Sequence, residues 1–172
     1  MHVYAGVLAY YRNNILFIQE ENIVDEAKSN KWAFPGGSVE SDDLAYEAAR
    51  EFDEETYGVV VDRKRLYERL LYCNYYDDGR IRIYYLDLES VTNETFLNCI
   101  SKSFLNVYSF LNSNCVNYGK YKAIITNNDP IYLETQKLQF LNYSHLENNM
   151  NLLRHELRRN IFEIISYGKF IM

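Results

Sequence analysis

The chain has 172 residues, of which 48% are hydrophobic and 16% aromatic, so it can bury a core and is too apolar to remain disordered. Its formal net charge of −6 argues against a broad nucleic-acid-binding surface, which needs a basic face. No stretch approaches the roughly 18 consecutive apolar residues of a membrane-spanning helix, so we expect no membrane partner.

The first half of the chain predicts two hairpins with a loop and a helix between them. Residues 3–11 and 15–20 are typical strands joined by a polar turn at residues 12–14. Ser41 is a suitable N-cap for the helix that follows, and Asp42 and Asp43 suit the positive end of its dipole. The runs 66–76 and 81–89, around the turn residues Asp77 to Gly79, predict the second hairpin.

The second half predicts helices and a further strand. Apolar residues at helical spacing indicate a helix over 94–112, which would be either a dimerisation element, giving a homodimer, or an insertion beside the substrate. A strand is expected at 122–126, the run 137–143 is ambiguous, and an apolar stripe from Met150 to Ile164 predicts a closing helix over about 147–166. This order indicates one domain over residues 1–172, of the α+β class, with a mixed sheet between helices.

The three cysteines, Cys73, Cys99 and Cys115, have no CxxC spacing, which favours a reduced, intracellular protein. The N-terminal segment lacks the basic leader of a signal peptide. We therefore expect a cytoplasmic location, in the host cytoplasm if the source is viral.

The helix after Ser41 is strongly two-sided. Its expected core-facing residues are Leu44, Ala45, Ala48, Ala49 and Phe52. The opposite side gathers Asp43, Glu47, Glu51, Glu54 and Arg50. Glu55 lies at the border, where a carboxylate would be partly desolvated and would need a charge partner or a metal.

The carboxylates of Glu51, Glu54 and Glu55 lie within one helical turn and could converge on a hard cation such as Mg²⁺. The alternative is a solvated acidic face. Gly36 and Gly37 precede the helix and allow positive φ and close backbone approach, so a ligand or metal could meet main-chain carbonyls there. A plain tight turn is the alternative for these two glycines.

Taken together, residues 37–59 resemble the Nudix box, G-x5-E-x7-R-E-U-x-E-E-x-G-U, where U is a bulky aliphatic residue. Residues 50–55, REFDEE, supply its centre, Gly37 its opening glycine, and Gly58 and Val59 its closing pair. Phe52 replaces the aliphatic residue, one residue is missing before Arg50, and Tyr57 is an extra residue before Gly58. The first box glutamate then corresponds to Asp42 or Asp43, depending on the end from which one counts.

The resemblance implies a Nudix α/β/α sandwich and a hydrolase that uses Mg²⁺ or Mn²⁺. Glu51, Glu54 and Glu55 would hold the metal, with the Gly37 carbonyl as a further ligand. Arg50 would orient a glutamate through a charge-assisted hydrogen bond, and Arg50, Glu51 and Glu54 would form the catalytic set. One glutamate would be the general base, unless a later residue such as Asp129, Glu134 or Glu147 supplies it.

Members of the family hydrolyse a nucleoside diphosphate linked to a further group, and the box does not identify that group. By resemblance to members that cleave dinucleoside polyphosphates, Tyr75 or Tyr76 would stack on a base and, with Gly36 and Gly37, bind substrate; ordinary strand packing is the alternative. Trp32, the single tryptophan, is expected in the core rather than on a base. We therefore expect a small nucleotide substrate of the ADP-ribose or dinucleoside polyphosphate type.

The stretches REFDEET and YYDDGRIRIYYL bear a weaker resemblance to Nudix enzymes of large DNA viruses, including mRNA-decapping members and an ADP-ribose pyrophosphatase. Decapping of capped RNA, releasing m7GDP, is therefore the alternative activity. It would favour basic residues near the site, and residues 62–65 and 154–159 are the candidates. A Nudix-fold module that binds nucleotides without cleaving them is the alternative of another class.

Overall fold

The computed structural model describes residues 1–20, 31–56, 58, 60–91, 105–106, 135–142, 153 and 160–171. Its strands are β1 (Tyr4–Tyr11), β2 (Asn14–Glu20), β3 (Lys31–Ala33), β4 (Gly36–Ser38), β5 (Tyr75–Asp77), β6 (Ile81–Asp87), β7 (Leu105–Asn106) and β8 (Thr135–Asn142). Its helices are α1 (Leu44–Glu55), α2 (Arg63–Leu70), the short 3-10 helix η1 (Leu88–Ser90) and α8 (Ile161–Ile171). None of these helices is long and apolar enough to cross a bilayer.

The described strands form a single mixed sheet in the order β5-β6-β1-β2-β8-β7, with β3 paired to β2 and β4 paired to β1. Strands β1 and β6 run parallel, and the other pairs are antiparallel. The N-terminal part of β1 pairs with β4, while its C-terminal end pairs with β2. Because β4 leads into α1, this pairing places the start of the predicted box beside the central strand.

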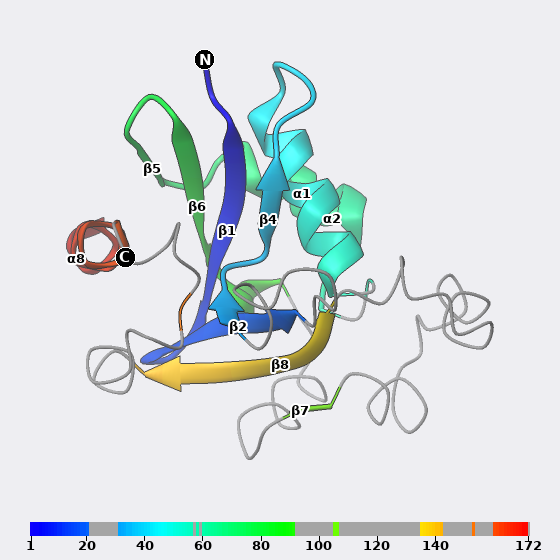
Figure 1. The fold of residues 1–172 in the computed structure, drawn as a ribbon, viewed down its shortest axis with the longest axis vertical. Coiled ribbons are helices and arrows are strands. Elements are labelled where there is room, and N and C mark those ends of the chain that lie inside the picture. Colours follow the sequence, from blue (N-terminus) through cyan, green and yellow to red (C-terminus); the bar gives the residue numbers. More distant parts are fainter. Residues whose placement is uncertain are drawn as a thin grey trace.

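Helices cover both sides of the sheet (Figure 1). α1 and α2 lie together on one side, and α1 packs on β1 and β4, while α8 lies on the other side against β5. The core between these layers includes Phe17, Phe34 and Phe52, all fully buried. The expected α+β sandwich with a mixed sheet between helices is therefore confirmed.

The first hairpin and the core stripe of the box helix are confirmed. β1 and β2 are joined at Arg12, whose φ of 55° is a left-handed conformation that suits a tight hairpin turn. Ala45, Ala48, Ala49 and Phe52 are buried against the sheet, and Leu44 is half-buried. Trp32 is also buried, as expected.

The second hairpin is only partly as predicted. Its turn and second strand form, but the run expected as a strand over 66–76 begins in helix α2, which ends at Leu70, and β5 begins only at Tyr75. Asp62 caps α2 by accepting a hydrogen bond from the Arg65 N–H. The tyrosines and leucines of this run suit a strand locally, but Leu66 and Leu70, one helical turn apart, are both buried.

The C-terminal predictions need two corrections. Leu105–Asn106 is strand β7 on β8, so the helix expected over 94–112 is wrong at those residues, and the rest of that range lies outside the described residues. The closing helix occupies Ile161–Ile171, and Leu153 forms an isolated bridge to Trp32, so the helix is not continuous over 147–166. The ambiguous run 137–143 falls largely in β8, and the strand expected at 122–126 lies outside the described residues.

Candidate active site

The box helix α1 begins two residues later than an N-cap at Ser41 would place it. Its N-cap is Asp43, whose carboxylate accepts a hydrogen bond from the Tyr46 N–H at 3.1 Å and another from the Tyr67 hydroxyl at 2.7 Å. Ser41 instead donates its hydroxyl hydrogen to Glu47 at 2.9 Å. Both aspartates are exposed, and the Asp43 carboxylate is engaged in capping α1 and in joining it to α2.

The far end of α1 is closed by Thr56 and Gly58. The Thr56 hydroxyl donates to the Phe52 carbonyl at 2.6 Å, and the Gly58 N–H donates to the Asp53 carbonyl at 2.9 Å. Gly58 has a φ of 68°, in the left-handed region where glycine is favoured after a helix. The left-handed backbone conformation at Gly58 therefore explains why the box closes with a glycine.

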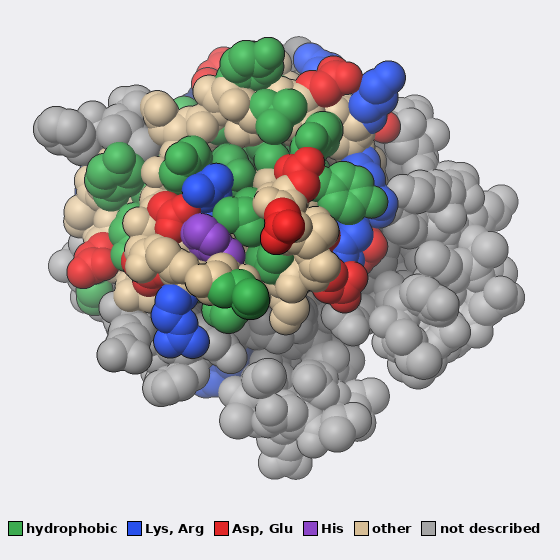
Figure 2. All heavy atoms as spheres, turned by 90° about the horizontal axis from the view of Figure 1, so that it is seen from above, with side chains coloured by type: hydrophobic (Ala, Val, Ile, Leu, Met, Phe, Trp, Pro, Cys, Tyr) green, Lys and Arg blue, Asp and Glu red, His purple; other side chains and the backbone are tan. Residues whose placement is uncertain are grey.

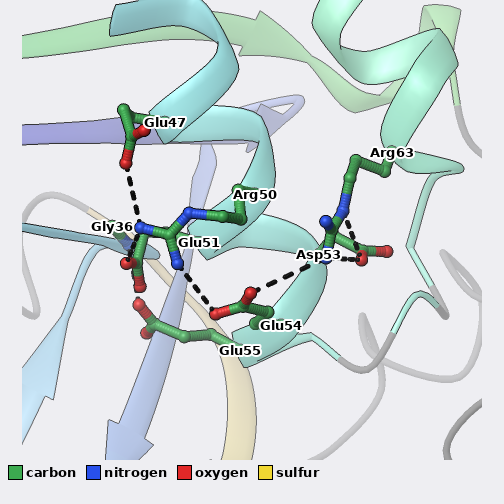
Figure 3. Close-up of polar contacts among 8 residues, drawn as sticks. All are labelled: Gly36, Glu47, Arg50, Glu51, Asp53, Glu54, Glu55 and Arg63. Atoms are coloured by element: carbon green, nitrogen blue, oxygen red, sulfur yellow. Dashed lines mark hydrogen bonds and ion pairs between the residues drawn. The ribbon is translucent and has the colours of Figure 1, made fainter. Parts of the chain in front are cut away.

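Arg50 lies at the centre of a cluster of glutamates on α1 (Figure 3). Its Nη2 is 2.7 Å from Glu51 Oε1 and 2.9 Å from Glu47 Oε2, and its Nη1 is 3.2 Å from Glu54 Oε2. Burial alone would lower the pKa of Arg50, but hydrogen bonding to Glu47 and the charges of Glu51 and Glu54 raise it. The charge-assisted hydrogen bond expected between Arg50 and a glutamate is present, so Arg50 fixes two of the three candidate metal ligands.

Glu47 is buried, although helical periodicity places it on the polar side of α1. The loop before the helix covers it and supplies the hydrogen bond from Ser41. Burial alone would raise the pKa of Glu47, but the hydrogen bonds from Arg50 and Ser41 outweigh this effect, and the pKa lies below its ordinary value of 4.5. Glu47 is thus the buried anchor of Arg50.

Glu47→Gln should therefore change how stability depends on pH. Because the pKa of Glu47 is lower in the folded state, its ionised form stabilises the fold above about pH 4.5, and this stabilisation is lost as the pH falls through the folded-state pKa. Urea unfolding should show the variant less stable than wild type by about 1–2 kcal/mol at neutral pH, with the gap closing below about pH 4.5. The exposed Glu40→Gln serves as control; a gap independent of pH would contradict the assignment.

At both Gly36 and Gly37 the absence of a Cβ lets another part of the protein approach the backbone closely, and the approaching groups differ. Neither has positive φ, because both lie in β4, so that part of the prediction is wrong. A Cβ on Gly37 would lie 2.5 Å and 2.7 Å from the two carboxylate oxygens of Glu51. The Gly36 N–H donates to Glu55 Oε1 at 3.0 Å, and Glu55 is buried as expected. Strand β4 therefore holds Glu55 through a backbone hydrogen bond and leaves space for the Glu51 carboxylate beside Gly37.

The donor set fits a divalent cation. Mg²⁺ and Mn²⁺ prefer oxygen ligands, and α1 supplies three carboxylates within one turn. The backbone at Gly37, which has no Cβ, lies close to one of them. Over the described part of the chain, no three acidic, histidine or cysteine side chains stand close enough to hold a metal as they lie. Glu51 and Glu54 turn toward Arg50, and Glu55 toward Gly36, which accounts for this separation.

The two tyrosine candidates face opposite sides of the sheet. Tyr76 donates its hydroxyl hydrogen to Glu163 of α8 at 2.8 Å, and burial together with this carboxylate raises the pKa of Tyr76 to about 12. Tyr75, next along the strand, is exposed and lies under the Arg82 guanidinium, 4.0 Å from the ring centre, with its edge on Tyr84. Only Tyr75 therefore lies on the side of the sheet that carries α1.

A hollow lies beside the loop that leads into α1. Its volume is about 290 Å³, and its lining comprises Met1, His2, Val39, Glu40, Ser41, Asp42 and Leu44. Figure 2 shows a face of the molecule on which acidic and basic side chains alternate with hydrophobic ones.

Asp53 and Arg63 form an ion pair beside the glutamates of α1, and the sequence did not predict this contact. Asp53 is the unspecified position within the box centre, and it is buried. The Arg63 Nε donates to Asp53 Oδ2 at 2.8 Å. Arg63 falls in the basic run 62–65 considered for RNA phosphates, and no spacing rule connects it to Asp53.

The fold and the site together define a class of protein: an α/β/α sandwich whose first helix sets an arginine among glutamates after a glycine-bearing strand. A model of the NUDIX domain matches residues 1–107, more than half of the chain. The chain therefore belongs to the Nudix family, as the box predicted.

A comparison with curated proteins finds no match. Among solved structures the chain is similar to a bifunctional NMN adenylyltransferase/ADP ribose pyrophosphatase from Francisella tularensis, solved in complex with AMP and a manganese ion. The TM-score is 0.55 and the sequence identity 16%, over 98% of this chain and 42% of that protein. The chain thus spans less than half of that protein, and the likeness shows the fold. The resemblance to viral Nudix enzymes stays a prediction.

Proposed function

We propose that this protein is a metal-dependent pyrophosphohydrolase that cleaves the diphosphate linkage of a nucleoside diphosphate derivative. The observation that supports this most directly is the box geometry: Arg50 joins Glu51 and Glu54, and the Cβ-free backbone at Gly37 lies against the Glu51 carboxylate. A stable acidic cluster of this kind has little structural purpose, because adjacent carboxylates repel. A divalent cation, bound together with a diphosphate, would offset this repulsion and give the cluster a catalytic purpose.

Glu51, Glu54 and Glu55 would hold the cation, with the Gly37 carbonyl as a further ligand. When bound, Mg²⁺ or Mn²⁺ neutralises the diphosphate and lowers the pKa of a water molecule. Arg50 orients Glu51 and Glu54, and an ion pair with the buried Glu47 holds the Arg50 guanidinium in place. Glu54, with the most exposed carboxylate of the three, is best placed to accept a proton from the attacking water. The other candidates for the base, Asp129, Glu134 and Glu147, lie outside the described residues.

The substrate class that we propose is ADP-ribose or a dinucleoside polyphosphate. The protein from Francisella tularensis is described as an ADP ribose pyrophosphatase and was solved with AMP and manganese, which supports this class for the shared fold. Tyr75 offers an exposed ring on the side of α1 where a base could stack, whereas Tyr76 is engaged by Glu163. The engagement of Arg63 by Asp53 favours a small nucleotide over capped RNA, and the other basic run, residues 154–159, lies outside the described residues.

The test is a chromatographic product assay with Mg²⁺ or Mn²⁺ on ADP-ribose, NAD, diadenosine polyphosphates, nucleoside triphosphates and capped RNA. We expect two monophosphate-bearing products from ADP-ribose, or the corresponding phosphorylated halves of a dinucleoside polyphosphate. Release of m7GDP from capped RNA alone would replace this proposal by decapping. Nucleotide binding that depends on the metal, without turnover of any substrate, would identify a binding module instead.

A further inference from the structure

Arg63, at the start of α2, contacts two acidic side chains of α1 (Figure 3). Its Nε and Nη2 lie 2.8 Å and 2.7 Å from Asp53 Oδ2, and its Nη2 lies 3.7 Å from Glu54 Oε1. Asp53 is 2% exposed, whereas the side chain of Glu54 is 47% exposed. Arg63 therefore links a carboxylate enclosed by the fold to one that substrate could reach.

The charge distribution of α1 explains why this contact is needed. The last five residues of the helix, EFDEE, include four acids, and its last turn has no basic residue. Acidic side chains are unfavourable there, because the carbonyl end of the helix dipole is also negative. Arg50 compensates from within α1, and Arg63 compensates from the neighbouring helix.

These two arginines approach Glu54 from different directions. Arg50 Nη1 lies 3.2 Å from Glu54 Oε2, while Arg63 Nη2 lies 3.7 Å from Glu54 Oε1. Asp53 is buried, so it holds the Arg63 guanidinium in a defined orientation. A carboxylate with a charge partner on each oxygen has a restricted rotation about its last bond.

We infer that Arg63 is a positioning residue for Glu54: anchored by Asp53, it sets the direction of the Glu54 carboxylate within the metal- and diphosphate-binding site. The inference rests on the proposed function for the role of Glu54. Arg63 acts through Glu54 and does not itself contact the substrate. A lysine could not replace it, because Arg63 reaches Asp53 through both Nε and Nη2, and a single ammonium on a flexible stem cannot reproduce that fixed orientation.

The test compares Arg63→Lys with Arg65→Lys, a matched change at an exposed position of the same helix. Both variants keep the net charge, so a change in Mn²⁺ affinity reports geometry rather than Coulomb attraction. Titration followed by electron paramagnetic resonance, without substrate, should show Mn²⁺ binding about 10-fold weaker in Arg63→Lys and unchanged in Arg65→Lys. In the Glu54→Gln background, the added Arg63→Lys should change the affinity by less than about 2-fold.

A merely structural role would lower the melting temperature of Arg63→Lys and leave Mn²⁺ affinity unchanged at temperatures where the protein is folded, and this result would overturn the inference. Equal effects of Arg63→Lys in the wild-type and Glu54→Gln backgrounds would also overturn it. Coupling between the two residues without turnover of any nucleotide would support the inference while overturning the proposed hydrolysis. Turnover with unaltered Mn²⁺ binding in Arg63→Lys would overturn the inference while supporting the proposed hydrolysis.

Discussion

Glu54→Gln should leave the chain folded and lower kcat by at least about 100-fold on whichever nucleotide the wild type hydrolyses. The side chain of Glu54 is 47% exposed, so the fold does not depend on its charge. Its loss also removes one negative charge from the acidic end of α1, where such charge is unfavourable. Glutamine keeps the shape of the side chain but cannot accept a proton from water and is a poorer ligand for a hard cation.

The measurement is steady-state kinetics with saturating Mn²⁺, together with the melting temperature of each variant. Glu68→Gln on α2, also an exposed glutamate, is the matched control and should retain wild-type activity. Unchanged turnover in Glu54→Gln, at an unchanged melting temperature, would remove Glu54 from the catalytic set and with it the base that we propose.

Gly37→Ala should abolish most activity with little loss of stability, while Gly36→Ala should destabilise the fold. The three atoms nearest to a Cβ on Gly37 would all belong to the carboxylate of Glu51, the far end of a flexible side chain, which can move aside. Glu51 would then lose its position beside Arg50, and a shift of about 1 Å at a reacting group can cost on the order of 100-fold in rate.

A Cβ on Gly36 would instead lie 2.6 Å from the Gly6 Cα and 2.8 Å from the Ala5 carbonyl oxygen. These atoms belong to the backbone of the central strand β1 and cannot move aside, so overpacking should cost about 1–3 kcal/mol. Chemical denaturation and Mn²⁺ binding of the two variants separate these effects. Wild-type activity in Gly37→Ala would mean that Glu51 works from a displaced position, contrary to the tight contact described above.

Features that depend on neighbours in sequence were predictable. Resemblance to the family motif located the box, helical spacing located the apolar stripe around Ala48 and Phe52, and the polar run after Tyr11 located the hairpin turn at Arg12. The contact between Arg50 and its glutamates is equally local, because side chains three or four residues apart meet on one face of a helix. The border position of Glu55 followed from the same geometry.

Features that depend on distant parts of the chain were not predictable in this way. Residues 66–70 were expected in a strand, yet they lie in α2, where Leu66 and Leu70 are buried on one side and Arg63 reaches Asp53. Glu47 has the periodicity of an exposed residue but is covered by the loop that contains Ser41.

The family, the acidic helix and the glutamates around Arg50 could be predicted from the sequence, because a family motif and the spacing of side chains along a helix involve only residues close together in the chain. Packing between separate elements, in contrast, decides that Asp43 binds Tyr67 of α2, that Tyr76 faces the closing helix and that Arg63 joins the site. Each of these depends on a contact between residues far apart in the chain or on separate elements, and such contacts are selected by how the packed helices and sheet share their buried surface and charge.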